Sequence, residues 1–265
     1  MKKVISSQKF LSLLAAVAIM AAGSCSSDDD AVADAVDTNA RPLIFHVSET
    51  PLADDDAPAA TRTAPTTTSS LSAFSYCYLT GSTLSGQESA SKNGSGIWSA
   101  SSGWPSVDEN AAVSFYAYAN ASPAKDDVFT DGEKFFLNFE VDETTYSQKD
   151  LLVATQSDTY THSRGNIGFQ FSHACGAVRF SLSKTAGLAD YHVLVKSVKI
   201  HNIPCSGTYC FDDGTWEIWS DSEYNKLFTL KSYGNDYLTV TSEKQFLSND
   251  GDYLFLLPQT AEGMG

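Results

Sequence analysis

Basic residues are scarce in this chain: its 265 residues include 17 Lys and Arg against 32 Asp and Glu, a formal net charge of −15 at pH 7. Proteins that bind nucleic acid neutralise phosphates with lysine and arginine, so the excess of acids excludes nucleic acid as a partner. The same excess argues against electrostatic binding to anionic lipid headgroups. Any attachment to a membrane must therefore come from acyl chains.

The sequence signatures of common enzymes are also missing. The chain has no Gly-x-Ser-x-Gly elbow and no glycine-rich phosphate loop. His173 and Cys175 lie two residues apart and would share a strand face, a spacing that could chelate a metal. No third or fourth ligand follows at a recognisable spacing, so a packing role is favoured. We therefore predict no enzyme, with no catalytic residue, no metal site and no cofactor.

Only one apolar run is long. Residues 10–22 hold 13 uncharged residues after a short basic segment, and Gly23-Ser24 follow them. Because a membrane-spanning helix needs roughly 20 apolar residues, residues 1–24 are predicted to be a removable secretory signal. Cys25 comes next and resembles the lipidated cysteine of the bacterial lipobox, although Ala22 stands where leucine is usual. The alternative is an ordinary signal peptide followed by an incidental cysteine.

The segment after Cys25 is acidic and lacks hydrophobic periodicity. Residues 25–42 begin Cys-Ser-Ser-Asp-Asp-Asp and are predicted to be a flexible tether, because they cannot bury enough apolar area to fold. An acidic run behind a lipidated cysteine resembles the export tag of Bacteroidetes lipoproteins carried to the outer face of the outer membrane. The resemblance predicts a lipid anchor in the outer membrane, at the cell surface. The alternative is a solvated linker facing the periplasm.

Cysteine is too sparse to define a disulfide framework. Besides Cys25 there are four, Cys77, Cys175, Cys205 and Cys210, and four thiols allow three full pairings. Cys205 and Cys210 flank a turn-like stretch where a local bridge could form. Cys77 and Cys175 lie in apolar runs typical of buried free thiols. A chain of this length can build a core without disulfides, so we expect no full framework.

The remaining residues show the pattern of an all-β protein. Short runs rich in Val, Ile, Phe, Tyr and Thr alternate with turn residues, and Asp-Gly pairs follow at 131–132, 213–214 and 250–251. Within 111–119, Val113, Phe115, Ala117 and Ala119 would line one face, and Tyr116 and Tyr118 the other. The runs are 71–80, 111–119, 135–141, 150–155, 167–173, 177–182, 193–201, 209–219, 226–230, 237–240 and 253–257. We predict β-sandwiches, with an N-terminal domain at 43–165 and a C-terminal domain at 166–265.

Several segments, taken in order, resemble the fimbrillin family of Bacteroidetes, the subunits of lipoprotein-derived (type V) pili. The resemblance covers residues 43–259. The matching pieces are Leu43-Ile44-Phe45, Thr61-Arg62-Thr63, Phe74 to Leu79, Ile97-Trp98 to Trp104-Pro105, Val113 to Tyr118, Asp150 to Ala154, Phe171 to Phe180, Ile203 to Tyr209 before Trp216, and Leu254 to Gln259.

This resemblance implies two transthyretin-like (Greek-key) β-sandwich domains and no catalysis. It implies a structural or tip/adhesive subunit of a cell-surface fimbria, exported as a lipoprotein. An arginine-specific protease would remove the lipidated segment together with one strand, and a strand of the next subunit would fill the groove by β-strand addition. Carried onto this chain, the removable strand holds Leu43, Phe45 and Val47, and the cleavage site is Arg62. The partners would be other fimbrial subunits and a host or bacterial surface ligand.

One departure from the family concerns the C-terminus. The chain ends at Gly265, soon after Pro258-Gln259, so the second domain is expected to be incomplete. The alternative function is a surface glycan-binding outer-membrane lipoprotein. It would use Trp98, Trp104 or Trp216 as a stacking face, although core filling is the favoured role for the tryptophans. The sequence does not specify the adhesion target, the processing protease or the position in a fibre.

Overall fold

The structure is a computed structural model of the chain, and it describes residues 41–50, 67–219, 221, 223, 225–247 and 253–258. Cys25 and Arg62 lie outside these residues, as do the predicted signal and nearly all of the predicted tether. The regular secondary structure of the described part is almost entirely strand, which confirms the all-β prediction. Its helical segments are one α-helical turn, α1 (Tyr160–Ser163), and the 3-10 turns η1 (Lys125–Asp127), η2 (Thr145–Ser147) and η3 (Ala186–Leu188). No helix in these ranges has the length and apolarity needed to cross a bilayer.

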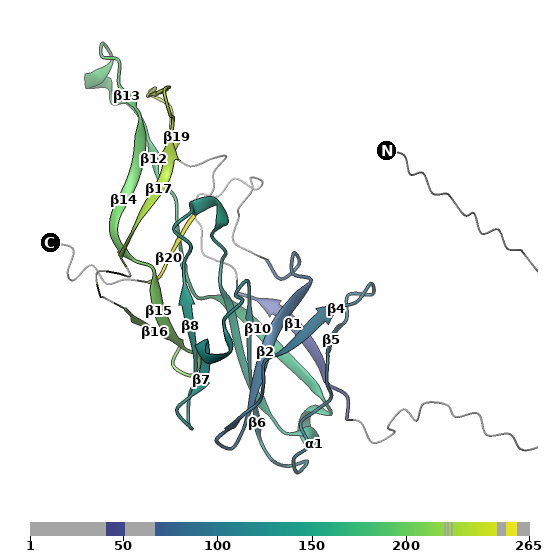
Figure 1. The fold of residues 1–265 in the computed structure, drawn as a ribbon. Helices are drawn as coiled ribbons and strands as arrows, with labels where there is room; N and C mark the ends of the chain where they lie inside the picture. Colours follow the sequence, from purple (N-terminus) through teal and green to yellow (C-terminus); the bar gives the residue numbers. More distant parts are fainter. Residues whose placement is uncertain are drawn as a thin grey trace, which may run out of the picture. The chain divides into compact units, whose positions relative to one another are not determined.

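The largest sheet closes on itself (Figure 1). Its order is β3-β2-β4-β5-β1-β10-β9-β6, and β6 also pairs with β2, so seven strands form a ring to which β3 is added. Every pairing is antiparallel except that of β1 with β10. Its strands are β1 (Ile44–Glu49), β2 (Ala73–Thr80), β3 (Thr83–Leu84), β4 (Glu88–Lys92), β5 (Trp98–Ala100), β6 (Val113–Ala119), β9 (Leu152–Asp158) and β10 (Asn166–His173). We call it the closed sheet.

An aromatic core lies on the inner face of the closed sheet. Alternation in the sequence produces it: Ile167, Phe169 and Phe171 of β10 are at most 1% exposed, and the exposed residues Gly168 and Gln170 separate them. Strand β6 is buried on both faces. As predicted, Phe115 and its alternate neighbours belong to this core, while Tyr116 and Tyr118 belong to a second core.

The second core is shared with a four-stranded sheet of order β16-β15-β8-β7. The rings of Tyr116 on β6 and Phe135 on β8 stack there, with centroids 4.5 Å apart. Pairing of β8 with β7 ends at Leu137, whereas pairing with β15 continues to Glu140. The strands are β7 (Val128–Thr130), β8 (Phe135–Glu140), β15 (Ser206–Cys210) and β16 (Thr215–Ile218).

The rest of the C-terminal part forms a two-stranded antiparallel ribbon, interrupted by irregular stretches. Residues 176–204 pair with residues 225–256 in four successive ladders, the longest being β14 with β17 (Figure 1). The strands are β11 (Gly176–Val178), β12 (Ser181–Leu182), β13 (Leu194–Val195), β14 (Ser197–Pro204), β17 (Asn225–Ser232), β18 (Leu238–Thr239), β19 (Gln245–Phe246) and β20 (Leu254–Leu256).

The predicted domain boundary after residue 165 falls directly before β10. Strand β10 nevertheless pairs with β1 and β9 of the closed sheet, so backbone pairing joins residues on both sides of that boundary. The division at 43–165 and 166–265, and the description of these parts as transthyretin-like sandwiches, stay predictions.

Candidate functional site

Strand β1 completes the closed sheet, because it is the piece between β5 and β10. It runs parallel to β10 over six residue pairs, from Ile44↔Asn166 to Glu49↔Phe171. On its other edge it pairs antiparallel with β5, at Ile44↔Ser99 and Phe45↔Trp98. Parallel neighbours require a crossover in the chain, and here more than a hundred residues separate the two strands. The N-terminal segment is thus inserted into a sheet built by later strands.

The alternating side chains of Leu43, Phe45 and Val47, predicted from the sequence, pack into or against the aromatic core. Leu43 and Phe45 are 4% and 2% exposed, and Val47 packs half-buried against the same cluster. The ring of Phe45 lies among four others, with centroid distances of 5.4 Å to Phe74, 5.0 Å to Tyr76, 6.5 Å to Phe115 and 5.1 Å to Phe169. Burying such a ring contributes about 1.5–3 kcal/mol. The slot that holds β1 is therefore a hydrophobic groove lined with aromatic residues.

Close backbone contacts hold both ends of β1. The N–H of Ile44 donates to the Gly165 carbonyl at 2.8 Å, and the N–H of Thr50 donates to the Phe171 carbonyl at 2.8 Å. At Gly165 the φ angle is +82°, and a Cβ there would lie 1.9 Å from the Pro42 oxygen, so only glycine lets the chain pass. Beyond the strand, the Glu49 carboxylate accepts a hydrogen bond from the Thr68 N–H.

Arg41, just before β1, contacts several other residues of the folded chain. Its guanidinium donates to the Val107 carbonyl at 2.8 Å, lies 3.4 Å from the Glu109 carboxylate and covers the Tyr160 ring at 5.1 Å from the centroid. Its own carbonyl accepts the Trp104 N–H at 2.9 Å. A protease that must draw an arginine side chain into its specificity pocket would first have to break these contacts.

The tryptophans considered as a sugar-stacking face are largely occupied. Trp98 and Trp104 are 5% and 6% exposed inside the closed sheet. Trp216 is half-buried, its indole N–H donates to the Ala174 carbonyl at 2.8 Å, and its ring packs against Tyr209. These positions support the core-filling interpretation.

The four cysteines and His173 are packed rather than assembled into a reactive centre. Cys77, Cys175, Cys205 and Cys210 are buried, and none of them forms a disulfide within the part of the chain that the structure describes. Burial raises the pKa of the Cys77 and Cys175 thiols to about 12, so both stay protonated at neutral pH. His173 does not turn to Cys175 as a ligand pair; its Nδ1 lies 2.7 Å from a carboxylate oxygen of buried Asp150. Within the described ranges no group of three or more His, Cys, Asp and Glu could hold a metal ion.

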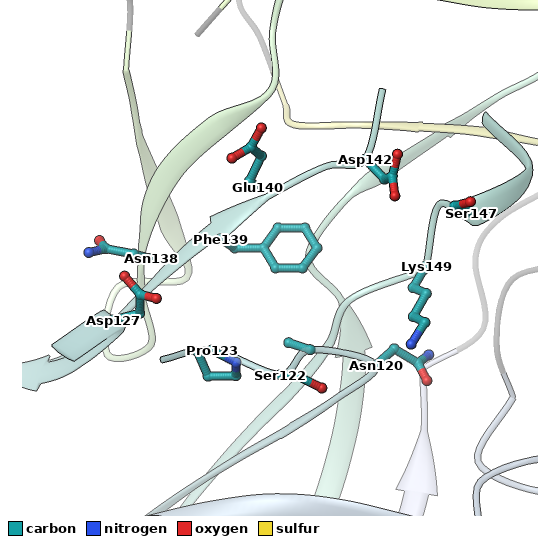
Figure 2. Close-up of a pocket in the computed structure, with 11 residues that line it drawn as sticks. Asn120, Ser122, Pro123, Asp127, Asn138, Phe139, Glu140, Asp142, Ser147 and Lys149 are labelled. Carbon is teal, nitrogen blue, oxygen red and sulfur yellow. The ribbon is translucent and has the colours of Figure 1, made fainter. Parts of the chain in front are cut away.

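Sequence reasoning missed a pocket beside β8, which Figure 2 shows in close-up. Its volume is about 330 Å³, and its lining comes from β8, from the stretch 120–127 and from the stretch 142–149. The Phe139 ring lies in the middle of the view, and polar side chains surround it. The nearby acid pairs Asp126-Asp127 and Asp142-Glu143 are visible in the sequence, but nothing there indicates that they share a cavity. We call this cavity the β8 pocket.

Backbone and side-chain hydrogen bonds fix several groups of the β8 pocket. Asp127 accepts the Ala124 N–H at 3.0 Å, and Asp142 accepts the Thr144 N–H at 2.7 Å. The side-chain amide oxygen Oδ1 of Asn138 accepts a hydrogen bond from the Thr208 hydroxyl at 2.8 Å. None of the ion pairs in the described part of the chain includes Lys149. The lining of the pocket is partly polar and partly apolar, and it carries charges of both signs.

These features define an all-β protein whose main sheet is closed by its own N-terminal strand. The chain belongs to the fimbrillin-like family, whose sequence profile matches residues 59–265. This confirms the family that the sequence motifs indicated. No curated protein sequence matches the chain.

Two solved structures from Bacteroides match the chain at low identity and with TM-scores below 0.5. A candidate cell adhesion protein of Bacteroides uniformis is 14% identical, with a TM-score of 0.42 over 79% of this chain and 74% of its own. A candidate cell adhesion protein of Bacteroides ovatus is 12% identical, with a TM-score of 0.43 over 82% and 89%.

Proposed function

We propose that this chain is a structural or tip/adhesive subunit of a cell-surface fimbria and that it assembles by exchanging β1 for a strand of another subunit. Family membership supports the class of protein, which has no catalytic role. The observation that carries the mechanism is the position of β1: it is an N-terminal segment inserted between β5 and β10, with Phe45 in an aromatic groove.

Loss of β1 would open the closed sheet along two edges. β10 and β5 would both expose backbone N–H and C=O groups, and the groove would expose aromatic surface. Backbone pairing and alternate side-chain pockets are what β-strand addition uses for affinity and register. A strand from a second subunit would restore both. Because the donor strand and the groove are different surfaces, the contact would propagate into a fibre instead of closing into a ring.

Processing at Arg62 fits this scheme better than processing at Arg41. Cleavage after Arg62 would detach the lipidated Cys25, the tether and β1 together. Cleavage after Arg41 would leave β1 in its groove, and the Arg41 side chain is held by Val107, Glu109 and Tyr160. The precursor would be held in the outer membrane through Cys25. After cleavage, the mature subunit, with its two transthyretin-like sandwich domains, would be located in the fimbrium.

Immunogold electron microscopy of cells expressing the full-length gene tests the proposal. Antibodies against the folded part should label filaments that extend from the surface. Label confined to the cell envelope, in cells that display the protein in quantity, would contradict a fimbrial role.

A further inference from the structure

We propose that the β8 pocket binds a neutral sugar residue of a glycan. This role goes beyond the proposed function, because it requires neither cleavage nor strand exchange. The pocket is formed entirely by residues 120–149 of a single subunit. Sugar binding can therefore be measured on unassembled protein.

The first argument is an aromatic side chain that is only half-buried on an otherwise buried strand face; its ring centroid lies 6.3 Å from that of Trp216. Phe135, Leu137 and Val141 alternate along β8 and its continuation, and each is at most 2% exposed. Phe139 has the same parity but is only half-buried, because the pocket opens where the pairing with β7 has ended. Its ring sits among the lining residues in Figure 2. An aromatic ring of this kind packs against the C–H face of a sugar while the hydroxyl groups point away.

The second argument is the mixture of hydrogen-bonding groups around that ring. A sugar hydroxyl both donates and accepts, so its site needs acceptors and donors together. Carboxylates of Asp127 and Asp142 supply acceptors, each already held by a backbone N–H. Lys149 and the Ser122 and Ser147 hydroxyl groups supply donors; Ser147 and Lys149 lie on the side of the pocket where Asp142 is, across from Asp127. A polar wall fixed before binding lowers the entropic cost of recognition.

The size and the charge of the pocket further restrict the class of ligand that it can bind. A volume of about 330 Å³ lies at the small end of the range for ligand pockets, roughly 300–1,000 Å³, and suits a single sugar ring. Three carboxylates, those of Asp127, Glu140 and Asp142, would repel an anionic sugar or a phosphate. A cationic side chain would be repelled by the Lys149 ammonium. It also offers no acceptor for hydrogen bonds from the Ser122 and Ser147 hydroxyl groups. A neutral, hydroxyl-rich ring satisfies both kinds of group.

The test is saturation-transfer NMR on the full-length chain in detergent micelles, with methyl glycosides of glucose, galactose, mannose, fucose and N-acetylglucosamine as probes. At least one glycoside should receive saturation from the protein. Phe139→Ala and Lys149→Met should each weaken its binding about tenfold or more, which is about 1.4 kcal/mol. The matched control is Phe129→Ala, which removes an exposed ring of the same sheet that does not line the pocket. Because the Lys149 side chain is exposed, Lys149→Met should fold normally. A loss of binding in this variant therefore cannot be attributed to misfolding.

Three results would overturn the proposal. One is the absence of saturation transfer to every glycoside of the panel. Another is transfer that survives both Phe139→Ala and Lys149→Met, which would place the sugar elsewhere on the protein. The third is binding of arginine methyl ester in place of the glycosides, which would make the pocket a site for basic side chains. None of these results bears on filament formation, so the two proposals fail separately.

Discussion

The ring of Phe45 stacks on the ring of Phe169 across the parallel β1–β10 pair, with centroids 5.1 Å apart and planes inclined by 21°. The two residues are diagonal neighbours, since Phe45 pairs with Ile167 and Val47 pairs with Phe169. This contact joins the N-terminal segment to the strand that follows α1. Changes at Phe45 therefore act directly on the aromatic groove.

Truncating Phe45 should destabilise the folded chain strongly. Phe45→Ala removes a ring that is 2% exposed and leaves a cavity among four aromatic neighbours, so we expect a loss of about 3–5 kcal/mol in the free energy of unfolding. Val47→Ala, on the same face but half-buried, should cost clearly less. Urea denaturation of the two variants provides the comparison. Equal losses would show that β1 does not hold its place through Phe45.

Replacing Arg62 should block maturation. In the unaltered protein, N-terminal sequencing of material released from the surface should give a start at Thr63. Arg62→Ala should stay lipidated and fail to assemble, because β1 remains in its groove. Arg41→Ala is the matched control: it removes the other arginine of the N-terminal segment and should still yield a start at Thr63. Assembled protein that begins at Cys25 would instead point to an anchor subunit.

Removing the thiol of Cys25 should abolish lipidation. Cys25→Ala should incorporate no radiolabelled palmitate, and the protein should leave the membrane fraction, since the acidic chain offers no electrostatic attachment. Cys77→Ala serves as the control, because Cys77 is buried in the closed sheet and should not affect labelling. Palmitate retained by the Cys25 variant would rule out Cys25 as the attachment point.

Stability should fall as the pH rises above the ordinary pKa of a thiol. Burial raises the pKa of Cys77 and Cys175 from 9.0 to about 12, so the folded state keeps protons that the unfolded chain releases. The contribution is complete below about pH 9 and is lost toward pH 12, by up to about 1.4 kcal/mol per pH unit for each thiol. Urea midpoints between about pH 8 and about pH 10 should decline, and less so in a Cys77→Ala/Cys175→Ala variant. An identical decline in both proteins would assign the effect to other groups.

Strand positions and buried faces could be predicted from the sequence because alternation is a local signal. The run 111–119 contains β6, and its two faces enter the two cores as expected. The closure of the sheet could not be predicted. It depends on the parallel pairing of β1 with β10. Nothing in the local sequence of either strand specifies its partner strand or the direction of the pairing.

The aromatic groove and the β8 pocket could also be predicted from the sequence only in part. Leu43, Phe45 and Val47 stand out as an alternating set, so the strand was found from the sequence, but the aromatic groove around it was not. For the β8 pocket, alternation predicts Phe139 to be as buried as Leu137. Its partial exposure arises because β7 stops pairing and the stretches 120–127 and 142–149 arrange themselves around the opening. That is a property of tertiary structure.

The parallel pairing of β1 with β10 also gives the groove a direction. A strand that takes the place of β1 in the same register must enter with its N-terminal end beside Gly165 and its C-terminal end beside Phe171. Every junction between subunits would then be oriented alike. A filament of such subunits would have a head and a tail, and growth at its two ends would be chemically different.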